Sequence, residues 1–221
     1  MTKTVVLASG GGTNFQTLID AKARGELPDT ELVGVISSSP DAYALTRAKA
    51  AGIPCHVVDK RDYRKMLDKN DRARTRFTNA IVKQLEKWDA DLVVTAGFLY
   101  ILTPQFAKKY SNRIINIHPS LLPSFGGKGC YGLHVHEKVL EYGVKVTGAT
   151  AHFLTPETDE GPIIVQKAVE VLSGDTPESL QLRVMQDAEW QILPQAVALF
   201  CSGKLSIEGR IVTAKADSKT E

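Results

Sequence analysis

Short apolar, β-branched runs alternate with helix-like segments through the first half of the chain, and this alternation limits the possible folds more than any other feature. The runs cover residues 5–8, 32–36, 55–58, 92–95 and 114–117. Strands that follow one another through helices usually pair in parallel and are covered on both faces. We therefore predict an α/β fold with an open, mostly parallel, twisted sheet and helices on both faces.

The segments between these runs have the apolar spacing of helices. Thr13 or Asn14 can cap the first helix, residues 42–51 predict a second, and the charged stretch 62–87 predicts a third. The pattern changes after Gly132. There we expect a helix over 134–142, two long strands over 144–154 and 163–171 that add antiparallel pairs, a final helix over 177–200 and a hairpin over 206–212.

Pro194 lies inside the expected final helix and should kink or interrupt it. We find no internal repeat and no linker that would divide the chain. Residues 1–212 are therefore expected to form a single domain, followed by a polar tail over 213–221.

Composition excludes several classes of protein. The chain has 221 residues with 27 Lys+Arg and 25 Asp+Glu, so its net charge of +2 argues against a protein that coats nucleic acid. Its 3 cysteines are too few and too scattered for a disulfide framework. No apolar run approaches the roughly 18 residues of a membrane helix. These features predict a cytoplasmic protein with neither a nucleic-acid nor a membrane partner.

Ligands of open parallel sheets bind beyond the carboxyl ends of the strands. Three segments follow expected strands directly and are the places to look for a site: residues 9–14, 97–102 and 116–132.

The first of these segments is the glycine loop, Ser9 to Asn14, with glycines at positions 10, 11 and 12. Its backbone can approach an anion closely, and the helix that follows offers free N–H groups. The spacing matches neither the dinucleotide fingerprint nor the P-loop. Phosphate binding and a simple tight turn both remain open on these residues alone.

Asn116 and His118 are two positions apart, so they share one side of an extended strand end. An amide donor beside an imidazole suits the stabilisation of an oxyanion and the transfer of a proton. Asp159 lies in an acidic turn before Gly161, and a carboxylate beside His118 would favour the charged imidazole. The alternative is that all three are ordinary strand-end and turn residues.

Other polar residues are weaker candidates. Cys130, His134 and His136 lack the paired spacing of zinc sites, so we expect no metal. His152 lies in an apolar strand and is most simply a hydrogen-bonded, partly buried histidine. The basic cluster over 60–76 is interspersed with aspartates, as on a solvated helix face.

The chain resembles the glycinamide ribonucleotide formyltransferases, folate-dependent enzymes of purine synthesis, from Val5 to about Leu205. The matching pieces are VLASGGGTNFQ at 6–16, DLVVTAGFLYIL at 91–102, NIHPSLLP at 116–123, TGATAHF at 147–153 and DEGPIIVQ at 159–166. The resemblance implies a Rossmann-like formyltransferase fold, with phosphate binding in the N-terminal half and folate binding in the C-terminal half.

The resemblance also implies a role for each matching residue. Catalysis falls to Asn116, His118 and Asp159. The ribonucleotide is bound by Gly12, Thr13, Asn14, Gln186 and Glu189. The folate is bound by Arg74, Leu99, Tyr100, Ile101, Leu102, Asn116, Thr155, Pro156, Glu157, Thr158 and Asp159.

The activity implied is transfer of the formyl group of 10-formyltetrahydrofolate to the amine of glycinamide ribonucleotide, without a metal, by a monomer or homodimer. Two departures stand out: Tyr100 replaces a common arginine, and the glycine-rich segment 125–133 is longer than in shorter members.

Relatives that hydrolyse formyltetrahydrofolate should carry an extra N-terminal domain, and those that act on methionyl-tRNA an extra C-terminal one. A noncatalytic phosphoribosyl-binding protein is the third alternative.

Overall fold

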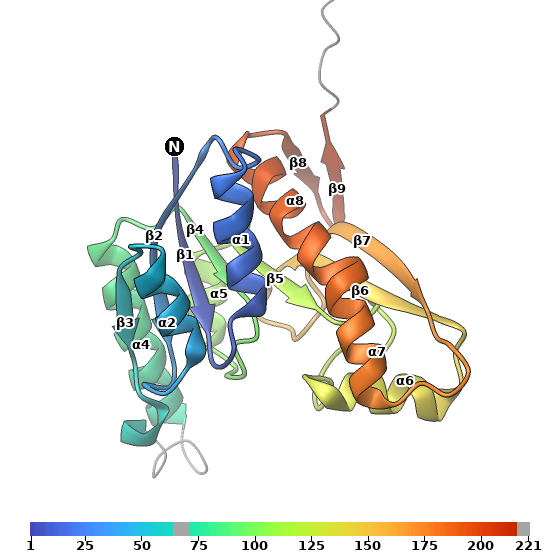
Figure 1. The fold of residues 1–221 in the computed structure, drawn as a ribbon. Coiled ribbons are helices and arrows are strands. Elements are labelled where there is room, and N and C mark those ends of the chain that lie inside the picture. Colours follow the sequence, from blue (N-terminus) through green and yellow to red (C-terminus); the bar gives the residue numbers. More distant parts are fainter. Residues whose placement is uncertain (64–70, 216–221) are drawn as a thin grey trace, which may run out of the picture.

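The computed structural model describes residues 1–63 and 71–215. A single 7-stranded sheet runs through it in the order β3-β2-β1-β4-β5-β6-β7 (Figure 1). The strands are β1 (Thr2–Ala8), β2 (Thr30–Ser37), β3 (Cys55–Val57), β4 (Leu92–Thr95), β5 (Ile114–His118), β6 (Val146–Phe153) and β7 (Ile163–Glu170). The first five strands in this order, from β3 through β2, β1 and β4 to β5, pair in parallel. Strand β6 runs antiparallel to both of its neighbours, β5 and β7. The predicted fold class is confirmed.

Helices cover both faces of the sheet, as predicted. Buried side chains of α1 (Thr13–Ala23), α2 (Tyr43–Ala50), α6 (Leu133–Tyr142) and α8 (Trp190–Cys201) belong to one apolar core. Those of α4 (Asp71–Lys87) and α5 (Pro104–Lys109) belong to the other. Alternate residues of β1 divide between the two cores, with Val6 in the first and Val5 and Leu7 in the second. Because successive side chains point to opposite faces and both faces are buried, the strand reads as a continuous apolar run.

The final helix is interrupted, but earlier than predicted. After α7 (Pro177–Val184), residues Met185–Glu189 form a π-helical turn, η2, before α8 begins. Pro194 lies inside α8. Because Pro194 has no N–H for the carbonyl of Trp190, the helical ladder has to adjust near this point. The wider π turn ends at Glu189, directly before Trp190.

Two further differences from the sequence prediction concern helices, while the predicted terminal hairpin is confirmed. Helix α5 was not predicted, although Thr103 caps it and Pro104 occupies its first turn. The stretch predicted as one helix over 62–87 gives a 3₁₀ turn, η1 (Lys60–Tyr63), and then α4, while residues 64–70 lie outside the described part. The terminal hairpin is present as β8 (Leu205–Glu208) and β9 (Ile211–Ala214).

Strand order reverses beside β1, because the chain builds outward to β3 and then returns to add β4 on the other side. Ser9 joins the two loops at this point. Its backbone N–H donates to the carbonyl of Gly97 at 3.1 Å, and its hydroxyl accepts the N–H of Leu99 at 3.1 Å. This is the position where open α/β sheets bind ligands.

No helix in the described ranges is long and apolar enough to cross a membrane.

Candidate active site

A cavity of about 770 Å³ opens at the carboxyl edge of the sheet. All three segments expected from the sequence line it, and the loop after β6 closes another side. The lining comes mainly from residues 10–14, 95–103, 116–119, 127–132 and 154–159, with His152, Gln181, Met185 and Glu189. A cavity of this size can bury a small ligand.

The glycine loop leaves the first turn of α1 uncapped. The predicted side-chain cap by Thr13 or Asn14 is wrong: Gly12 occupies the N-cap position and no side chain bonds to the turn. Gly12 has a φ of 67°, and an added Cβ would lie 2.7 Å from Cβ of Ala44. Free N–H groups at a helix start that borders a cavity suit an anionic ligand.

Asn14 and Glu189 form a buried pair beside the glycine loop. Nδ2 of Asn14 donates to Oε2 of Glu189 at 2.6 Å, and Oδ1 of Asn14 is buried without a partner. Burial raises the pKa of the Glu189 carboxyl to about 7. The π turn brings this carboxylate into the cavity wall together with Met185.

Gln186, predicted from the resemblance to bind the ribonucleotide, is not among the described residues of the cavity lining. It is exposed, and its backbone carbonyl accepts a hydrogen bond from Gln191. One step along a helix rotates a side chain by about 100°, so a residue next to Met185 points elsewhere. Gln181, which sequence reasoning missed, lies one turn before Met185 and does line the cavity.

Asn116 is held by two neighbours in the sheet. Thr95 of β4 donates its hydroxyl to Oδ1 of Asn116 at 2.6 Å. Nδ2 of Asn116 lies 3.1 Å from Nε2 of His152, the residue opposite on β6. These bonds fix which way the amide faces and leave one N–H of Asn116 available to a ligand.

His152 is neutral and has a defined tautomer. Its Nδ1 lies 2.9 Å from the carbonyl of Phe153, which can only accept, so Nδ1 carries the hydrogen. Burial lowers the pKa of His152, so Nε2 is free to accept from Asn116. The expectation of a buried, hydrogen-bonded histidine is confirmed, but the contact with Asn116 was missed.

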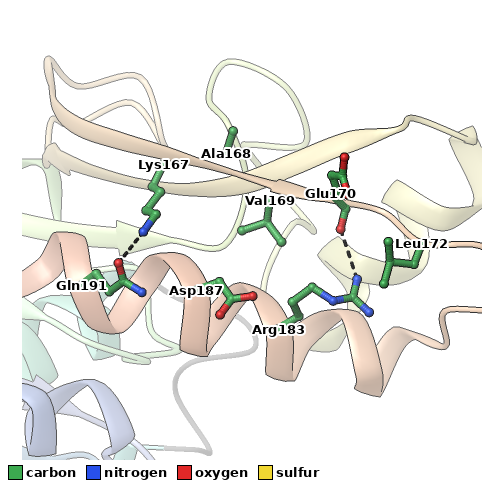
Figure 2. Close-up of a pocket in the computed structure, with 8 residues that line it drawn as sticks. All are labelled: Lys167, Ala168, Val169, Glu170, Leu172, Arg183, Asp187 and Gln191. Carbon is green, nitrogen blue, oxygen red and sulfur yellow. Dashed lines mark hydrogen bonds between the residues drawn. The ribbon is translucent and has the colours of Figure 1, made fainter.

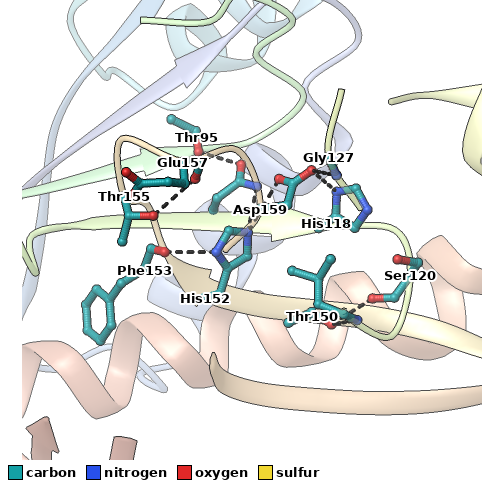
Figure 3. Close-up of polar contacts among 12 residues, drawn as sticks. Thr95, His118, Ser120, Gly127, Thr150, His152, Phe153, Thr155, Glu157 and Asp159 are labelled. Carbon is teal, nitrogen blue, oxygen red and sulfur yellow. Dashed lines mark hydrogen bonds and ion pairs between the residues drawn. The ribbon is translucent and has the colours of Figure 1, made fainter. Parts of the chain in front are cut away.

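His118 and Asp159 face each other across the cavity floor, with Nδ1 of His118 3.6 Å from Oδ2 of Asp159 (Figure 3). Nε2 of His118 lies 3.0 Å from the carbonyl of Phe125 and therefore carries a hydrogen. A proton gained by His118 goes to Nδ1, facing the carboxylate. The two side chains are thus placed to pass a proton between them.

Asp159 is held in an uncommon backbone conformation, with a φ of 59°. Oδ2 accepts the N–H of Gly127 at 2.8 Å, and Oδ1 lies 3.9 Å from Nε2 of His152. The chain then turns sharply at Gly161, where a Cβ would lie 1.6 Å from the carbonyl oxygen of Phe153. Strained residues of this kind are found preferentially at functional sites.

The loop after β5 is tied to β6 and β7. The hydroxyl of Thr150 donates to the carbonyl of Ser120 at 2.7 Å and accepts the N–H of Leu122 at 3.1 Å. Gln166 of β7 donates to the carbonyl of Leu122 at 2.9 Å. These bonds fix the backbone that follows His118.

The opposite wall of the cavity is apolar. Leu99 and Ile101 are each 60% exposed, which is unusual for large apolar side chains. The loop that carries them rests on an aromatic cluster of Phe98, Tyr100 and Phe77, with ring centroids 5.5–6.3 Å apart. This wall suits a flat, largely apolar ligand. Thr155, Pro156, Glu157 and Thr158 form the adjoining edge.

Arg74, the remaining residue predicted to contact folate, is half-buried in α4 and is not among the described residues that line the cavity. Tyr100 lines the cavity and lies under Lys60, whose Nζ is 5.7 Å from the ring centroid.

Within the described ranges, no three His, Cys, Asp or Glu side chains gather as a metal ion would require.

A second cleft, of about 390 Å³, lies between β7 and the helices α7 to α8 (Figure 2). Its cations already have protein partners. Arg183 donates to the carbonyl of Glu170 at 3.1 Å and to Asp175 at 2.6 Å, and Lys167 donates to Gln191. It contains none of the candidate catalytic residues.

The chain matches the formyl transferase family over residues 2–197. The chain belongs to this family. It is 37% identical to phosphoribosylglycinamide formyltransferase of Haemophilus influenzae over 211 residues, which cover 96% of this chain and 92% of that protein. A solved structure, glycinamide ribonucleotide transformylase 1 from Symbiobacterium toebii, is 41% identical with a TM-score of 0.87, covering 98% of this chain and 95% of that one.

A longer relative is the trifunctional purine biosynthetic protein adenosine-3 of Gallus gallus. It is 42% identical over 205 residues, or 93% of this chain, but this chain spans only 19% of its length. The resemblance drawn from the sequence motifs is confirmed at the level of the family and fold.

Proposed function

We propose that the chain transfers the formyl group of 10-formyltetrahydrofolate to the amine of N1-(5-phospho-D-ribosyl)glycinamide, giving the N-formyl product and tetrahydrofolate in purine synthesis. One observation carries the proposal. The cavity holds Asn116, His118 and Asp159 between an uncapped glycine loop and an apolar wall. The relatives named above as formyltransferases of the same ribonucleotide support it.

The two substrates would occupy opposite ends of the cavity. The glycine loop, with Gly12, Thr13 and Asn14, binds the phosphate, and Glu189 lies beside the sugar. Loop 99–102 and residues 155–158 bind the folate. Both halves of the chain thus contribute to both subsites. A cytoplasmic location, a single domain over 1–212 and a monomeric or dimeric state stay predictions.

In the reaction, the amine nitrogen attacks the formyl carbon and the carbonyl oxygen becomes an oxyanion. The free N–H of Asn116 and the imidazolium of His118 stabilise this charge, and one such donor contributes about 3–4 kcal/mol in comparable sites. Asp159 faces Nδ1 of His118 at 3.6 Å and receives the proton lost by the amine, directly or through water. The bond from carbon to the folate nitrogen then breaks, and that nitrogen takes up the proton that Asp159 received from the amine. No covalent enzyme intermediate is needed.

The test is consumption of 10-formyltetrahydrofolate by the purified protein with and without glycinamide ribonucleotide. The proposal predicts consumption only when the ribonucleotide is present, with one product formed for each folate used. Equal consumption without the ribonucleotide would identify a hydrolase. No consumption in either case, despite binding of the ribonucleotide, would leave a binding protein.

A further inference from the structure

The cavity is rich in carboxylates and poor in cations, although its proposed ligand carries a phosphate. Glu157, Asp159 and Glu189 all line it. The glycine loop supplies backbone N–H groups but no full positive charge. A phosphate monoester carries a charge of about −1.5 to −2 near pH 7. Only Glu189 lies beside the glycine loop, but backbone N–H groups alone leave most of the charge of the phosphate without a counter-charge, so a cation is expected there.

Lys128 is the only Lys or Arg among the described residues that line the cavity. Its side chain is exposed, and within the described ranges its ammonium group has no hydrogen bond or ion pair. Arg47, the cation nearest the glycine loop along α2, is already engaged: it donates to the carbonyl of Gly11 at 2.9 Å and to Gln16 at 3.0 Å. Lys128 is thus the available cation.

The backbone on both sides of Lys128 is anchored. Before it, the N–H of Gly127 donates to Asp159 at 2.8 Å. After it, Lys138 of α6 donates to the carbonyl of Gly129 at 3.1 Å and to Sγ of Cys130 at 3.2 Å. Gly127 and Gly129 have φ values of 86° and 83°, which glycine adopts without strain. These anchors hold Lys128 at the cavity rim.

Segment 127–132 joins the catalytic Asp159 to α6, and through α6 to the helices that carry Gln181 and Glu189. Segment 127–132 leads directly into α6, and α6 packs against α7. Gln181 of α7 continues into the wall formed by Met185 and Glu189, and Glu189 is bonded to Asn14 of the glycine loop. The folate wall is built from other segments, 99–102 and 155–158.

We propose that Lys128 binds the phosphate of the ribonucleotide, supplying the positive charge that the glycine loop lacks. This inference rests on the proposed function and adds a binding residue to it. It also gives a role to the long glycine-rich segment 125–133: its flanking glycines and two anchors present one lysine to the cavity.

Kinetics of Lys128→Ala and Lys128→Arg test the proposal, with Lys83→Ala as a control that removes an exposed lysine from α4, away from the cavity lining. A charge-assisted hydrogen bond corresponds to a change of about tenfold or more. Lys128→Ala should raise the KM for glycinamide ribonucleotide by about tenfold, leave kcat and the KM for formyl folate nearly unchanged, and weaken the salt dependence of the first KM. Lys128→Arg should restore most of the affinity, and Lys83→Ala should match wild type.

Two ligands test whether Lys128 acts on the phosphate or on another part of the ribonucleotide. With glycinamide ribonucleoside, which lacks the phosphate, Lys128→Ala should have no effect. Inorganic phosphate, titrated calorimetrically, should bind more weakly to Lys128→Ala than to wild type. The phosphate titration does not depend on catalysis. If the wild-type protein binds phosphate but transfers no formyl group, the proposed function fails while the role of Lys128 can still be tested. An unchanged KM for the ribonucleotide, or a rise only in the KM for formyl folate, would overturn the assignment.

Discussion

The side-chain amide of Asn116 lies 3.1 Å from Nε2 of His152, so one of its two N–H groups is already used inside the protein. The hydroxyl of Thr95, 2.6 Å from Oδ1, occupies the other end of the amide. The remaining N–H is therefore directed by the sheet itself. Preorganised donors lose little free energy to reorientation when charge develops on the substrate.

Asn116→Ala should lower kcat by at least about 100-fold, the scale for losing one oxyanion donor. The KM values should change much less, because the phosphate and folate walls remain intact. Steady-state kinetics with both substrates check this. Thr95→Val is the matched variant. It keeps the amide of Asn116 and removes only the hydroxyl that orients it, so its kcat should fall between those of Asn116→Ala and wild type. Wild-type turnover in Asn116→Ala would remove Asn116 from the chemistry.

Asp159→Asn should lower kcat by at least about 100-fold near neutral pH. The substitution keeps an oxygen for the N–H of Gly127 but removes the negative charge 3.6 Å from Nδ1 of His118. The variant therefore loses the charge that faces His118 and the acceptor of the amine proton. Steady-state kinetics with both substrates check this, and wild-type kcat in Asp159→Asn would show that Asp159 takes no part in the chemistry.

Gly11→Val should weaken binding of glycinamide ribonucleotide by about tenfold while leaving folate binding unchanged, because its side chain would block the approach of the phosphate to the backbone. A Cβ at Gly11 meets no atom within 4 Å, so the fold should be unaffected. Gly12 is a poorer choice. Its φ of 67° and the contact with Ala44 at 2.7 Å predict that Gly12→Val also destabilises the fold. Calorimetry with each ligand, beside thermal unfolding, separates the effects. Loss of folate binding alone would reverse the two subsites.

Glu189→Gln should stabilise the unliganded protein at pH 8 and have little effect at pH 5. Burial raises the pKa of Glu189 to about 7 from an ordinary value of 4.5. The folded state therefore holds a proton that the unfolded state releases, and the free energy of unfolding falls as pH rises from about 4.5 to about 7. This difference corresponds to about 3 kcal/mol. Urea unfolding of both proteins at the two pH values measures it, and a pH-independent difference would contradict the buried titration.

Strands β1, β2, β4 and β5 could be predicted because they bury side chains on both faces of a parallel sheet and so read as apolar runs. The location of the cavity followed from strand polarity alone, since loops at the carboxyl ends converge on one edge. Helix α5 was missed although Thr103 and Pro104 form an ordinary helix start. Its length of 6 residues is too short for apolar spacing to show.

The partners of Asn116 could not be predicted from the residues. His152 lies opposite Asn116 only because β6 pairs antiparallel to β5 in one particular register. A shift of one residue would turn its ring to the other face of the sheet. Gln186, which we predicted to bind the ribonucleotide, is absent from the described cavity lining for a related reason. Which face of the last helices meets the cavity depends on the π turn at Met185–Glu189, and no pattern in the sequence marks that turn.

The most direct test of the account follows a ¹³C-labelled formyl group from 10-formyltetrahydrofolate by NMR in the presence of glycinamide ribonucleotide. The label should appear in the formyl amide of the ribonucleotide, in step with loss of the folate signal, and Asn116→Ala should slow its appearance. Label recovered as free formate, at the same rate whether or not the ribonucleotide is present, would contradict formyl transfer to the amine.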